Sequence, residues 1–446
     1  MGRRPGGPGR LRRPVGRPGR GAWEGVLTPV NVAFTTIGCK LNQADTDALR
    51  HAFEQQGHRV TLDPSAADAH IVNTCTVTGR ADRDCRKAIR RARRAAPDAL
   101  IVVVGCLAQT DEDRLRAMPE VDWVVHRGAF EALPAGLQRG TPPALAGPLG
   151  SLERRSVGDR ARAQLVIQDG CERMCTYCKV PLARGPQRSL PADDVERACA
   201  ELAAEGYPEI VLVGCNLGAW GEDSGEESLA GLLTRLLRAD LPRLRLSSIE
   251  PDTLTDELAE VIAGSHGRIC PHLHIAQQSG SPGVLEAMGR GTDVAFLERR
   301  IARLRHADPL FGIGFDLLVG FPAEDEAAFA ETVELLERTR PANLHVFPFS
   351  PREGTPAMAL GDTVSPPEKK RRVRTVIDLG EALRGEWLEA HLGRCLRVVV
   401  DRADDGRVSG IAETYARVSA EGREPIGTLA ELTPTRVVNG ELRAER

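Results

Sequence analysis

Short apolar runs alternate with amphipathic segments along the first third of the chain. The runs at residues 32–37, 69–73, 100–104 and 121–125 have the length and composition of buried strands. Helices are predicted between these runs, at residues 41–56, 81–96 and 111–117. Alternating strands and helices are typical of a parallel sheet with helices on its faces. We therefore expect an open α/β domain over residues 31–140.

The same alternation continues over residues 163–385. Six further strands are predicted, at residues 165–168, 209–213, 243–249, 272–275, 312–319 and 343–347. Helical patterns separate most of them, at residues 193–205, 229–239, 252–263 and 327–340. Six strand–helix repeats are fewer than the eight that close a barrel, so we expect an open, partial (β/α)6 barrel. Its functional residues should lie at the carboxyl ends of the strands, where such barrels carry their active sites.

The last residues, 386–446, hold mainly short strand-like runs with turns between them. These runs lie at residues 395–401, 407–412, 415–418 and 425–432, after a charged helix at 366–392. Short strands without helices between them predict a small antiparallel barrel. Residues 141–162 are rich in Gly, Pro and Arg and are expected to be a linker. The predicted fold class is therefore α/β, with an open parallel sheet, a partial barrel and a small antiparallel β-barrel in chain order.

Composition limits the partners and the cellular compartment that can be expected for the chain. Its 446 residues carry a net charge of −3, so a nucleic-acid partner would need local basic patches. Eleven cysteines without a secretory signal favour metal ligands and core thiols over a disulfide framework. No run of 18 apolar residues is present that would span a membrane. We therefore expect a cytoplasmic protein.

The first residues differ from the rest of the chain. Up to Glu24 they contain seven arginines and no acidic residue, interleaved with Gly and Pro. Such a segment cannot bury apolar surface, so residues 1–28 are expected to be a disordered basic tail. Two interpretations stay open, an arm that binds RNA and a dispensable or wrongly assigned start. The second is favoured.

Three cysteines stand close together directly after the first strand of the predicted barrel. Cys171, Cys175 and Cys178 have the spacing C-x3-C-x2-C. Three thiolates in one loop can each bind one iron of a cubane cluster and leave the fourth iron open. Zinc structural sites need four ligands, and no further Cys or His lies nearby in the sequence. An iron–sulfur cluster is therefore favoured over zinc or chance cysteines.

Three other cysteines each follow a strand of the first domain. They are Cys39, Cys75 and Cys106, in the segments IGCKLNQ, NTCTVT and VGCLAQ. Right-handed crossovers bring the carboxyl ends of parallel strands to one edge of the sheet, where ligands bind. The three thiols can therefore converge on a second cluster, although ordinary core thiols remain an equal alternative. Cys85, in the middle of a charged helix, is interpreted as structural.

These motifs resemble a known family. The three-cysteine loop, with Tyr177 before its last cysteine, is similar to that of radical S-adenosylmethionine (SAM) enzymes. The segments GCKLNQADTDAL, VNTCTVTGRADRDCRKAIR and VVVGCLAQ resemble the N-terminal domain of the methylthiotransferases within that group. The residues of these segments, and those of HVFPFSPREGTPA at 345–357, resemble the branch that acts on N6-threonylcarbamoyladenosine in tRNA. The tail resembles a TRAM domain, in which Tyr415 and Arg417 are candidates for contacts with RNA.

The resemblance implies two 4Fe–4S clusters and SAM as cofactors. Cys171, Cys175 and Cys178 would hold the catalytic cluster, and the other three cysteines an auxiliary one. Polar residues at successive strand ends match the family patterns LVGCNLG, SSIEP, HLH-QSGS and AMGR. They are the expected SAM or substrate contacts Gly214, Asn216, Ser248, Glu250, Gln278 and Arg290.

The implied activity is addition of a methylthio group to C2 of N6-threonylcarbamoyladenosine next to the tRNA anticodon. The implied partners are the tRNA anticodon loop and an electron donor such as flavodoxin or ferredoxin, and a monomer is expected. Two substrates stay open as alternatives, isopentenyladenosine in tRNA and an aspartate of ribosomal protein S12. An alternative of another class is a non-catalytic iron–sulfur protein that binds RNA and senses redox state.

Overall fold

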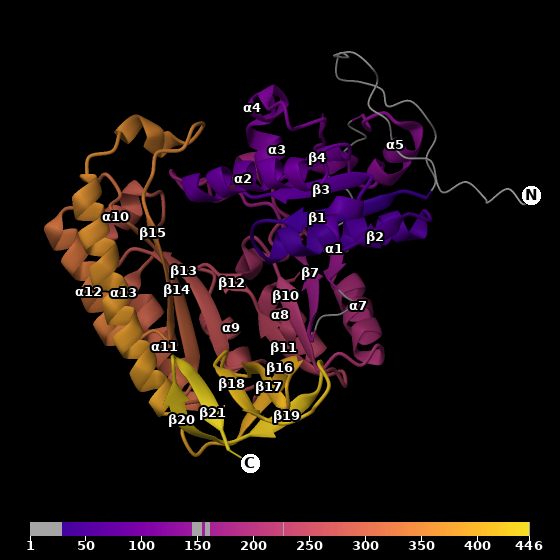
Figure 1. Cartoon of the computed structure of the whole chain (residues 1–446). Helices are drawn as coiled ribbons and strands as arrows, with labels where there is room; N and C mark the ends of the chain where they lie inside the picture. Colours follow the sequence, from indigo (N-terminus) through magenta and orange to yellow (C-terminus); the bar gives the residue numbers. More distant parts are fainter. Residues whose placement is uncertain (1–28, 145–153, 157–160, 226, 446) are drawn as a thin grey trace, which may run out of the picture. The chain divides into compact units, whose positions relative to one another are not determined.

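The computed structural model describes residues 29–144, 154–156, 161–225 and 227–445 (Figure 1). The expected basic tail lies outside the described residues, and so does most of the expected linker, whose described part includes β6 (Arg154–Ser156). The described residues form two compact units. Unit 1 comprises those up to Ser156 together with residues 179–185, and unit 2 comprises the remainder.

Unit 1 is built on a parallel sheet with the strand order β2-β1-β3-β4-β5. The strands are β1 (Asn31–Thr36), β2 (Arg59–Thr61), β3 (Ala69–Thr74), β4 (Leu100–Gly105) and β5 (Trp123–Val124). The helices are α1 (Lys40–Gln55), α2 (Gly79–Ala95), α3 (Cys106–Thr110), α4 (Glu112–Ala117), α5 (Leu133–Arg139) and α6 (Val180–Arg184), with the short turns η1 (Pro64–Ala66) and η2 (Arg127–Ala129).

Both faces of this sheet are buried. Alternate residues of a strand point to opposite faces, so Ile71 packs with Phe53 of α1 while Val72 packs with Ile89 of α2. Sheets covered on both faces have strands that are almost entirely apolar, as the run LIVVV in β4 is. The predicted open α/β fold of this region is confirmed.

The central part of unit 2 carries parallel strands in the predicted order. They are β7 (Ala163–Val166), β10 (Glu209–Val213), β11 (Arg243–Leu246), β12 (Ser248–Ile249), β13 (His272–Gln278), β14 (Gly312–Val319) and β15 (Asn343–Pro348). β11 and β12 are the two halves of one predicted strand, which is interrupted at Ser247, so six strand positions result. A short hairpin of β8 (Gln168–Asp169) and β9 (Arg188–Ser189) adjoins them.

Helices connect these strands and cover them. They are α7 (Ala192–Ala204), α8 (Leu229–Leu236), α9 (Asp256–Ala263), α10 (Pro282–Ala287), α11 (Val294–Ala307), α12 (Glu326–Thr339) and α13 (Pro366–Glu389), with the turns η3 (Leu217–Ala219) and η4 (Pro356–Leu360). Figure 1 shows α12 and α13 running side by side along β14 and β15. The helices α10 and α11 were not among the elements expected from the sequence. None of the helices in the described part of the chain combines the length and the apolar character that a bilayer crossing requires.

The tail forms a curled sheet with the strand order β19-β16-β17-β18-β21-β20. Its strands are β16 (Leu396–Asp404), β17 (Arg407–Ala412), β18 (Arg417–Glu421), β19 (Leu429–Leu432), β20 (Pro434–Val438) and β21 (Glu441–Ala444). A register shift between Val400 and Arg402 bends β16, as bulges do, and lets the sheet wrap around its own core. The expected small barrel is confirmed in outline, but the sheet is mixed because β18 and β21 pair in parallel.

The tail packs against the amino ends of the core strands. Arg243 and Arg245 of β11 donate to backbone carbonyls of β16 and β17, including Ala412 at 3.0 Å. Tyr415 stacks on His272, with ring centroids 4.2 Å apart. Arg417 donates to both carboxylate oxygens of Asp401 at 2.8 and 3.0 Å. Tyr415 and Arg417, the residues expected to contact RNA, are therefore engaged in contacts within unit 2.

Candidate active site and auxiliary cysteine site

The loop with Cys171, Cys175 and Cys178 follows the hairpin strand β8, at the carboxyl end of the first core strand. Three backbone hydrogen bonds anchor it: Thr176 N–H donates to the Met288 carbonyl (2.9 Å), Cys178 N–H to the Cys175 carbonyl (3.0 Å), and Ala357 N–H to the Thr176 carbonyl (2.7 Å). The Tyr177 ring packs against the apolar cluster around Met288. The loop is therefore held by other segments of unit 2 and presents three thiols.

The donor set of this loop fits a polynuclear cluster. Two thiolates that share one zinc ion lie about 3.8 Å apart, given a Zn–S bond of about 2.3 Å. Within the described residues, the three sulfurs do not form a group whose atoms all lie within 4.8 Å of one another. Three soft thiolates in one loop can each bind one iron of an iron–sulfur cluster.

Arg290 brings several predicted residues into contact. Its guanidinium is buried and donates to the carboxylate of Glu250 and to the carbonyl of Ala276. It also lies 3.6 Å from the Cys175 sulfur and 3.3 Å from the Tyr177 hydroxyl. Burial raises the pKa of the Tyr177 hydroxyl well above its usual value, so the phenol is neutral. The buried Arg290–Glu250 ion pair thus lies against Cys175 of the cysteine loop.

Gly214 and Asn216 meet at the carboxyl end of β10 around Gln168. The side-chain oxygen Oε1 of Gln168 accepts the Asn216 backbone N–H at 2.9 Å, and a Cβ on Gly214 would lie 2.9 Å from the same oxygen. Glycine is therefore required for this close approach. The side-chain oxygen of Asn216 is buried and has no hydrogen-bond partner in the described part of the chain. Asn216 also lines a cavity of ≈ 410 Å³ with Arg173.

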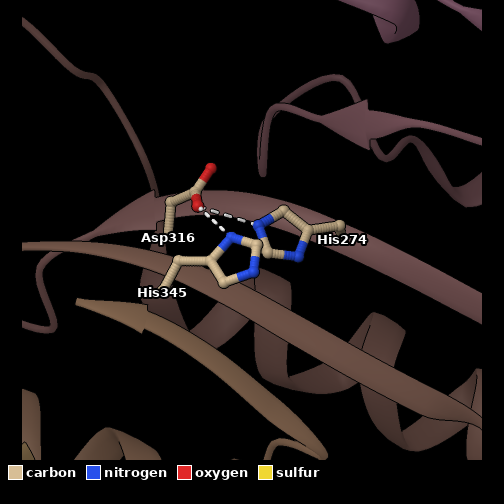
Figure 2. Close-up of side chains that lie close together, drawn as sticks. All are labelled: His274, Asp316 and His345. Carbon is tan, nitrogen blue, oxygen red and sulfur yellow. Dashed lines mark hydrogen bonds and ion pairs between the residues drawn. The ribbon is translucent and has the colours of Figure 1, made fainter. Parts of the chain in front are cut away.

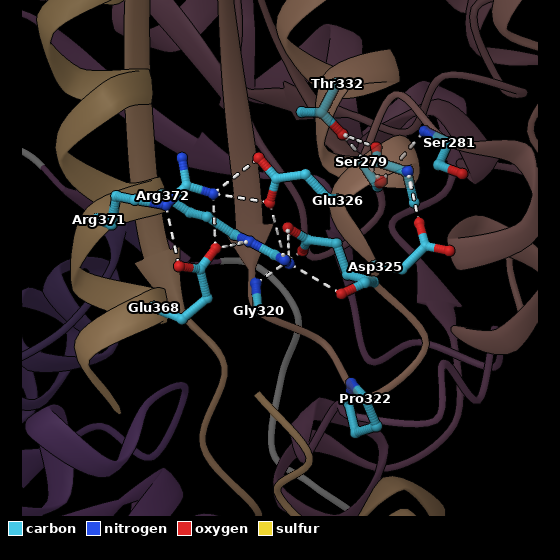
Figure 3. Close-up of polar contacts among 12 residues, drawn as sticks. Ser279, Ser281, Gly320, Pro322, Asp325, Glu326, Thr332, Glu368, Arg371 and Arg372 are labelled. Carbon is cyan, nitrogen blue, oxygen red and sulfur yellow. Dashed lines mark hydrogen bonds and ion pairs between the residues drawn. The ribbon is translucent and has the colours of Figure 1, made fainter. Parts of the chain in front are cut away.

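Ser248 and Gln278 take no part in these contacts between described residues. Ser248 lies in β12, beside His274 of β13. Gln278 ends β13 at a register shift and has φ of 70°, a conformation that is strained for a residue with a side chain. Ser279 and Gly280 follow and bond to Thr332 of α12 at 3.2 and 2.9 Å (Figure 3).

A second network fixes the end of β14. The Gly320 N–H donates to the Glu324 carboxylate at 2.6 Å, and Arg372 of α13 donates to the same carboxylate at 3.1 Å. Figure 3 shows Arg371 and Arg372 reaching from α13 toward this loop. The polar residues of the segment GFPAE thus hold a strand end in place.

The second set of cysteines gathers around Asn42 in unit 1. Cys39 precedes α1, Cys75 follows β3, and Cys106 begins α3. The Asn42 side-chain oxygen lies 3.6 Å from the Cys39 sulfur and 3.8 Å from the Cys106 sulfur. A Cβ on Gly38 would lie 3.0 Å from the Cβ of Cys75. The strand ends therefore bring the three thiols together around Asn42 and Gly38.

Buried cations adjoin this second set. Burial raises the pKa of the Cys106 thiol, and Arg184 and Arg127 act in the opposite direction. Arg184 of α6 donates to Asn42 at 2.9 Å and to Asp45 at 3.1 Å, and Arg127 donates to Asp45 at 2.9 Å. These cations favour thiolate ligands and an anionic cluster. The sequence analysis missed both arginines, because nothing in the spacing of a single arginine predicts its partner.

Cys85 lies directly behind this set. Its sulfur accepts the Cys75 N–H at 3.3 Å, and burial raises the pKa of its thiol to about 12. A buried thiol that binds the backbone of a neighbouring cysteine supports that backbone rather than the cluster itself. This arrangement agrees with the structural role predicted for Cys85.

Together, the partial barrel of parallel strands and its anchored three-cysteine loop define a radical SAM protein. Residues 165–336 match the model of the radical SAM superfamily, and residues 31–126 match that of "Uncharacterized protein family UPF0004". The radical SAM methyltransferase TsrM from Kitasatospora setae shares the fold, with a TM-score of 0.53 at 16% identity over 86% of this chain and 77% of that chain.

Proteins that are similar to this chain over most of its length indicate which family of radical SAM proteins it belongs to. The "Threonylcarbamoyladenosine tRNA methylthiotransferase MtaB" of Bacillus subtilis is 36% identical over 410 residues, which are 88% of this chain and 91% of the relative. That of Aquifex aeolicus is 36% identical over 90% of this chain and 100% of the relative. A "tRNA-2-methylthio-N(6)-dimethylallyladenosine synthase" of Sphingopyxis alaskensis is 33% identical over 84% and 87%. The chain belongs to the radical SAM methylthiotransferase family, in its MtaB branch. It is thus an enzyme whose cofactors are SAM and 4Fe–4S clusters, as the resemblance predicted.

Proposed function

We propose that this enzyme adds a methylthio group to C2 of N6-threonylcarbamoyladenosine, next to the anticodon of tRNA. The observation that carries the proposal is the pair of separate three-cysteine sets, one in each unit, in a chain 36% identical to two MtaB enzymes. A reaction that both activates a C–H bond and inserts sulfur needs two such sites. A non-catalytic redox sensor would need neither a SAM site nor a cavity beside it.

The cofactors carry the difficult chemistry, and the side chains position them. When bound, SAM and the two clusters supply the reductive C–S cleavage, the inserted sulfur and the methyl group. Cys171, Cys175 and Cys178 hold one cluster, and Cys39, Cys75 and Cys106 hold the other. Each set is anchored by backbone hydrogen bonds or close packing, so the ligands are fixed before the cofactor binds.

The remaining predicted residues have the chemistry to bind SAM. The unpaired side-chain oxygen of Asn216 can accept a hydrogen bond from the ammonium group of SAM, and Gly214 keeps the Gln168 side chain in place. The Arg290 guanidinium can attract the SAM carboxylate, while Glu250 balances its charge. Ser248 and Gln278 lie on the same sheet and are assigned to SAM or the nucleoside.

A tRNA substrate also implies the compartment in which the enzyme works. In this proposal that compartment is the cytoplasm, where flavodoxin or ferredoxin can reduce its clusters. We assign the anticodon loop as the bound segment, because bases in a loop are already partly unstacked and C2 can be reached at little cost. The enzyme acts as a monomer in this proposal, since both cysteine sets lie in one chain.

The proposal is tested on the nucleosides of bulk tRNA. We expect a strain that lacks the gene to lose 2-methylthio-N6-threonylcarbamoyladenosine, as measured by mass spectrometry of digested tRNA. A plasmid copy of the gene should restore it, whereas a Cys175→Ala copy should not.

The competing substrates give different outcomes. Loss of the methylthiolated isopentenyl nucleoside instead would favour the second candidate, which the 33% identity to the Sphingopyxis alaskensis enzyme supports. Unchanged tRNA together with loss of a methylthio group from ribosomal protein S12 would refute the tRNA substrate. If neither tRNA nor that protein changed, the enzyme proposal itself would fail.

A further inference from the structure

Three side chains of metal-ligand type meet on one face of the core sheet, and none of them belongs to either cysteine set. His274, Asp316 and His345 come from the neighbouring strands β13, β14 and β15. Asp316 is paired directly with His345, and His274 is paired with Gly314 two residues before Asp316. Because alternate residues of a strand share a face, this register places the three side chains together.

The ligand atoms of this group converge on one point (Figure 2). His274 Nε2 lies 2.9 Å from Asp316 Oδ1, and His345 Nδ1 lies 3.1 Å from the same oxygen. All three atoms lie within 4.8 Å of one another. Ligands in adjacent positions around one transition-metal ion are separated by about 3.0–3.3 Å, given bonds of about 2.0–2.1 Å. The observed separations are close to these values.

Hydrogen bonding accounts for only part of the arrangement, because His345 Nδ1 bonds to Asp316 Oδ1 at 3.1 Å but His274 Nε2 does not. His274 Nε2 is buried and makes no hydrogen bond of acceptable geometry within the described residues, although it lies near the carboxylate. A buried ring nitrogen without a partner is unfavourable. A bound cation would satisfy it, because the lone pair of a neutral imidazole then points at the ion.

The backbone makes room for the His274 ring. A Cβ on Gly314 would lie 2.6 Å from His274 Nδ1, so any side chain at this position would displace the imidazole. The His274 ring is thereby held over the neighbouring strand. Its centroid lies 4.6 Å from the centroid of the His345 ring. The glycine at this point of an otherwise apolar strand is explained by the position of His274.

The composition of the group also suits a cation. Two imidazoles and one carboxylate make up a ligand set that zinc and ferrous sites use.

We propose that His274, Asp316 and His345 form a binding site for a divalent transition-metal ion, and that the bound ion is Zn²⁺ or Fe²⁺. The side chain of His345 is 53% exposed, so the remaining coordination positions are open to water or to an oxygen ligand on that side. The side-chain amide of Asn343 contacts His345 Nε2 at 3.3 Å through its nitrogen and helps to fix the orientation of the ring. The site does not depend on which nucleoside is modified.

Zinc content of the reconstituted holoenzyme tests this proposal. After one equivalent of ZnCl₂ and desalting, we expect about one zinc per chain by mass spectrometry, with the cluster iron unchanged. X-ray absorption at the zinc edge should show only nitrogen and oxygen ligands at about 2.0–2.1 Å. The His345→Ala and Asp316→Asn variants should each lose most of the zinc and keep their iron.

The control distinguishes this site from other histidines and from the cysteines. His306 is exposed on α11, and a His306→Ala variant should bind zinc like the wild type. Sulfur ligands at about 2.3 Å would show that zinc occupies cysteine positions, and would overturn the proposal. Equal zinc in the His345→Ala, Asp316→Asn and His306→Ala variants would overturn it as well.

Discussion

Asn42 and Arg184 determine the surroundings of the auxiliary cysteines at the scale of single residues. The Asn42 amide nitrogen donates to the Thr74 carbonyl at 2.8 Å, while its oxygen faces two of the three sulfurs. The Arg184 guanidinium then donates to that oxygen at 2.9 Å. A single buried cation therefore lies one hydrogen bond away from the ligands of a cluster, and it should influence the electron affinity of that cluster.

We expect Arg184→Met to lower the reduction potential of the auxiliary cluster. Removal of a nearby positive charge destabilises the more negative, reduced form, and a loss of about 1–2 kcal/mol corresponds to about 40–90 mV for one electron. The potential is measured by redox titration with electron paramagnetic resonance, in a Cys171/Cys175/Cys178→Ala background that leaves one cluster.

Arg94→Met provides the matched control, because Arg94 is exposed on α2 of the same unit. If the two variants had the same potential, the proposed influence of Arg184 on the cluster would be wrong.

At the scale of elements, buried charges join the core strands to the tail sheet. Glu209 begins β10 and accepts from Arg243 and Arg245 of β11, at 2.7 Å in each case. Burial alone raises the pKa of Glu209, but the two guanidinium groups hold it well below its usual range. The same arginines donate to carbonyls of β16 and β17, so one carboxylate pairs with both of the cations that attach the tail.

Replacing Glu209 by Gln should destabilise unit 2. The substitution leaves two buried arginines without their counter-charge, which costs about 3–5 kcal/mol for a buried pair. We expect the thermal midpoint to fall by about 6–15 °C, measured by circular dichroism of the reconstituted enzyme. Glu205→Gln is the control, since Glu205 is exposed at the end of α7, and its midpoint should stay unchanged. An unchanged midpoint in Glu209→Gln would show that the carboxylate is dispensable for this packing.

At the scale of the whole molecule, each unit carries its own cysteine set on its own sheet. Cys39, Cys75 and Cys106 depend on the strand ends of unit 1, and the other three on the loop of unit 2. Each sheet has separate apolar packing, so the loss of one ligand set leaves the other in place.

The iron content of the enzyme should therefore divide equally between two independent sites. Anaerobically reconstituted enzyme should hold about eight irons per chain, and the Cys171/Cys175/Cys178→Ala variant about four. The reciprocal Cys39/Cys75/Cys106→Ala variant should also hold about four, measured by colorimetric iron assay and ultraviolet–visible absorption. If the Cys171/Cys175/Cys178→Ala variant bound no iron, the auxiliary site would not be independent.

Much of the fold could be predicted because its signals are local. Apolar runs of four to eight residues predicted the six core strands, and the loop with Cys171, Cys175 and Cys178 is a pattern within eight consecutive residues. The tail was predicted less well, because β20 and β21 are short and half exposed, and the parallel pairing of β21 with β18 depends on distant residues.

The sequence by itself thus determined the fold class and predicted where both groups of cysteines lie, because strand ends of a parallel sheet share an edge whatever the details of packing. Only the tertiary structure decided which side chains meet those sets. Arg184 reaches Asn42 because α6 packs in unit 1 against α3, which no local pattern indicates. The group of His274, Asp316 and His345 likewise depends on strand register. Each member alone is an ordinary polar residue on a strand, and only pairing across three strands makes them a possible metal site.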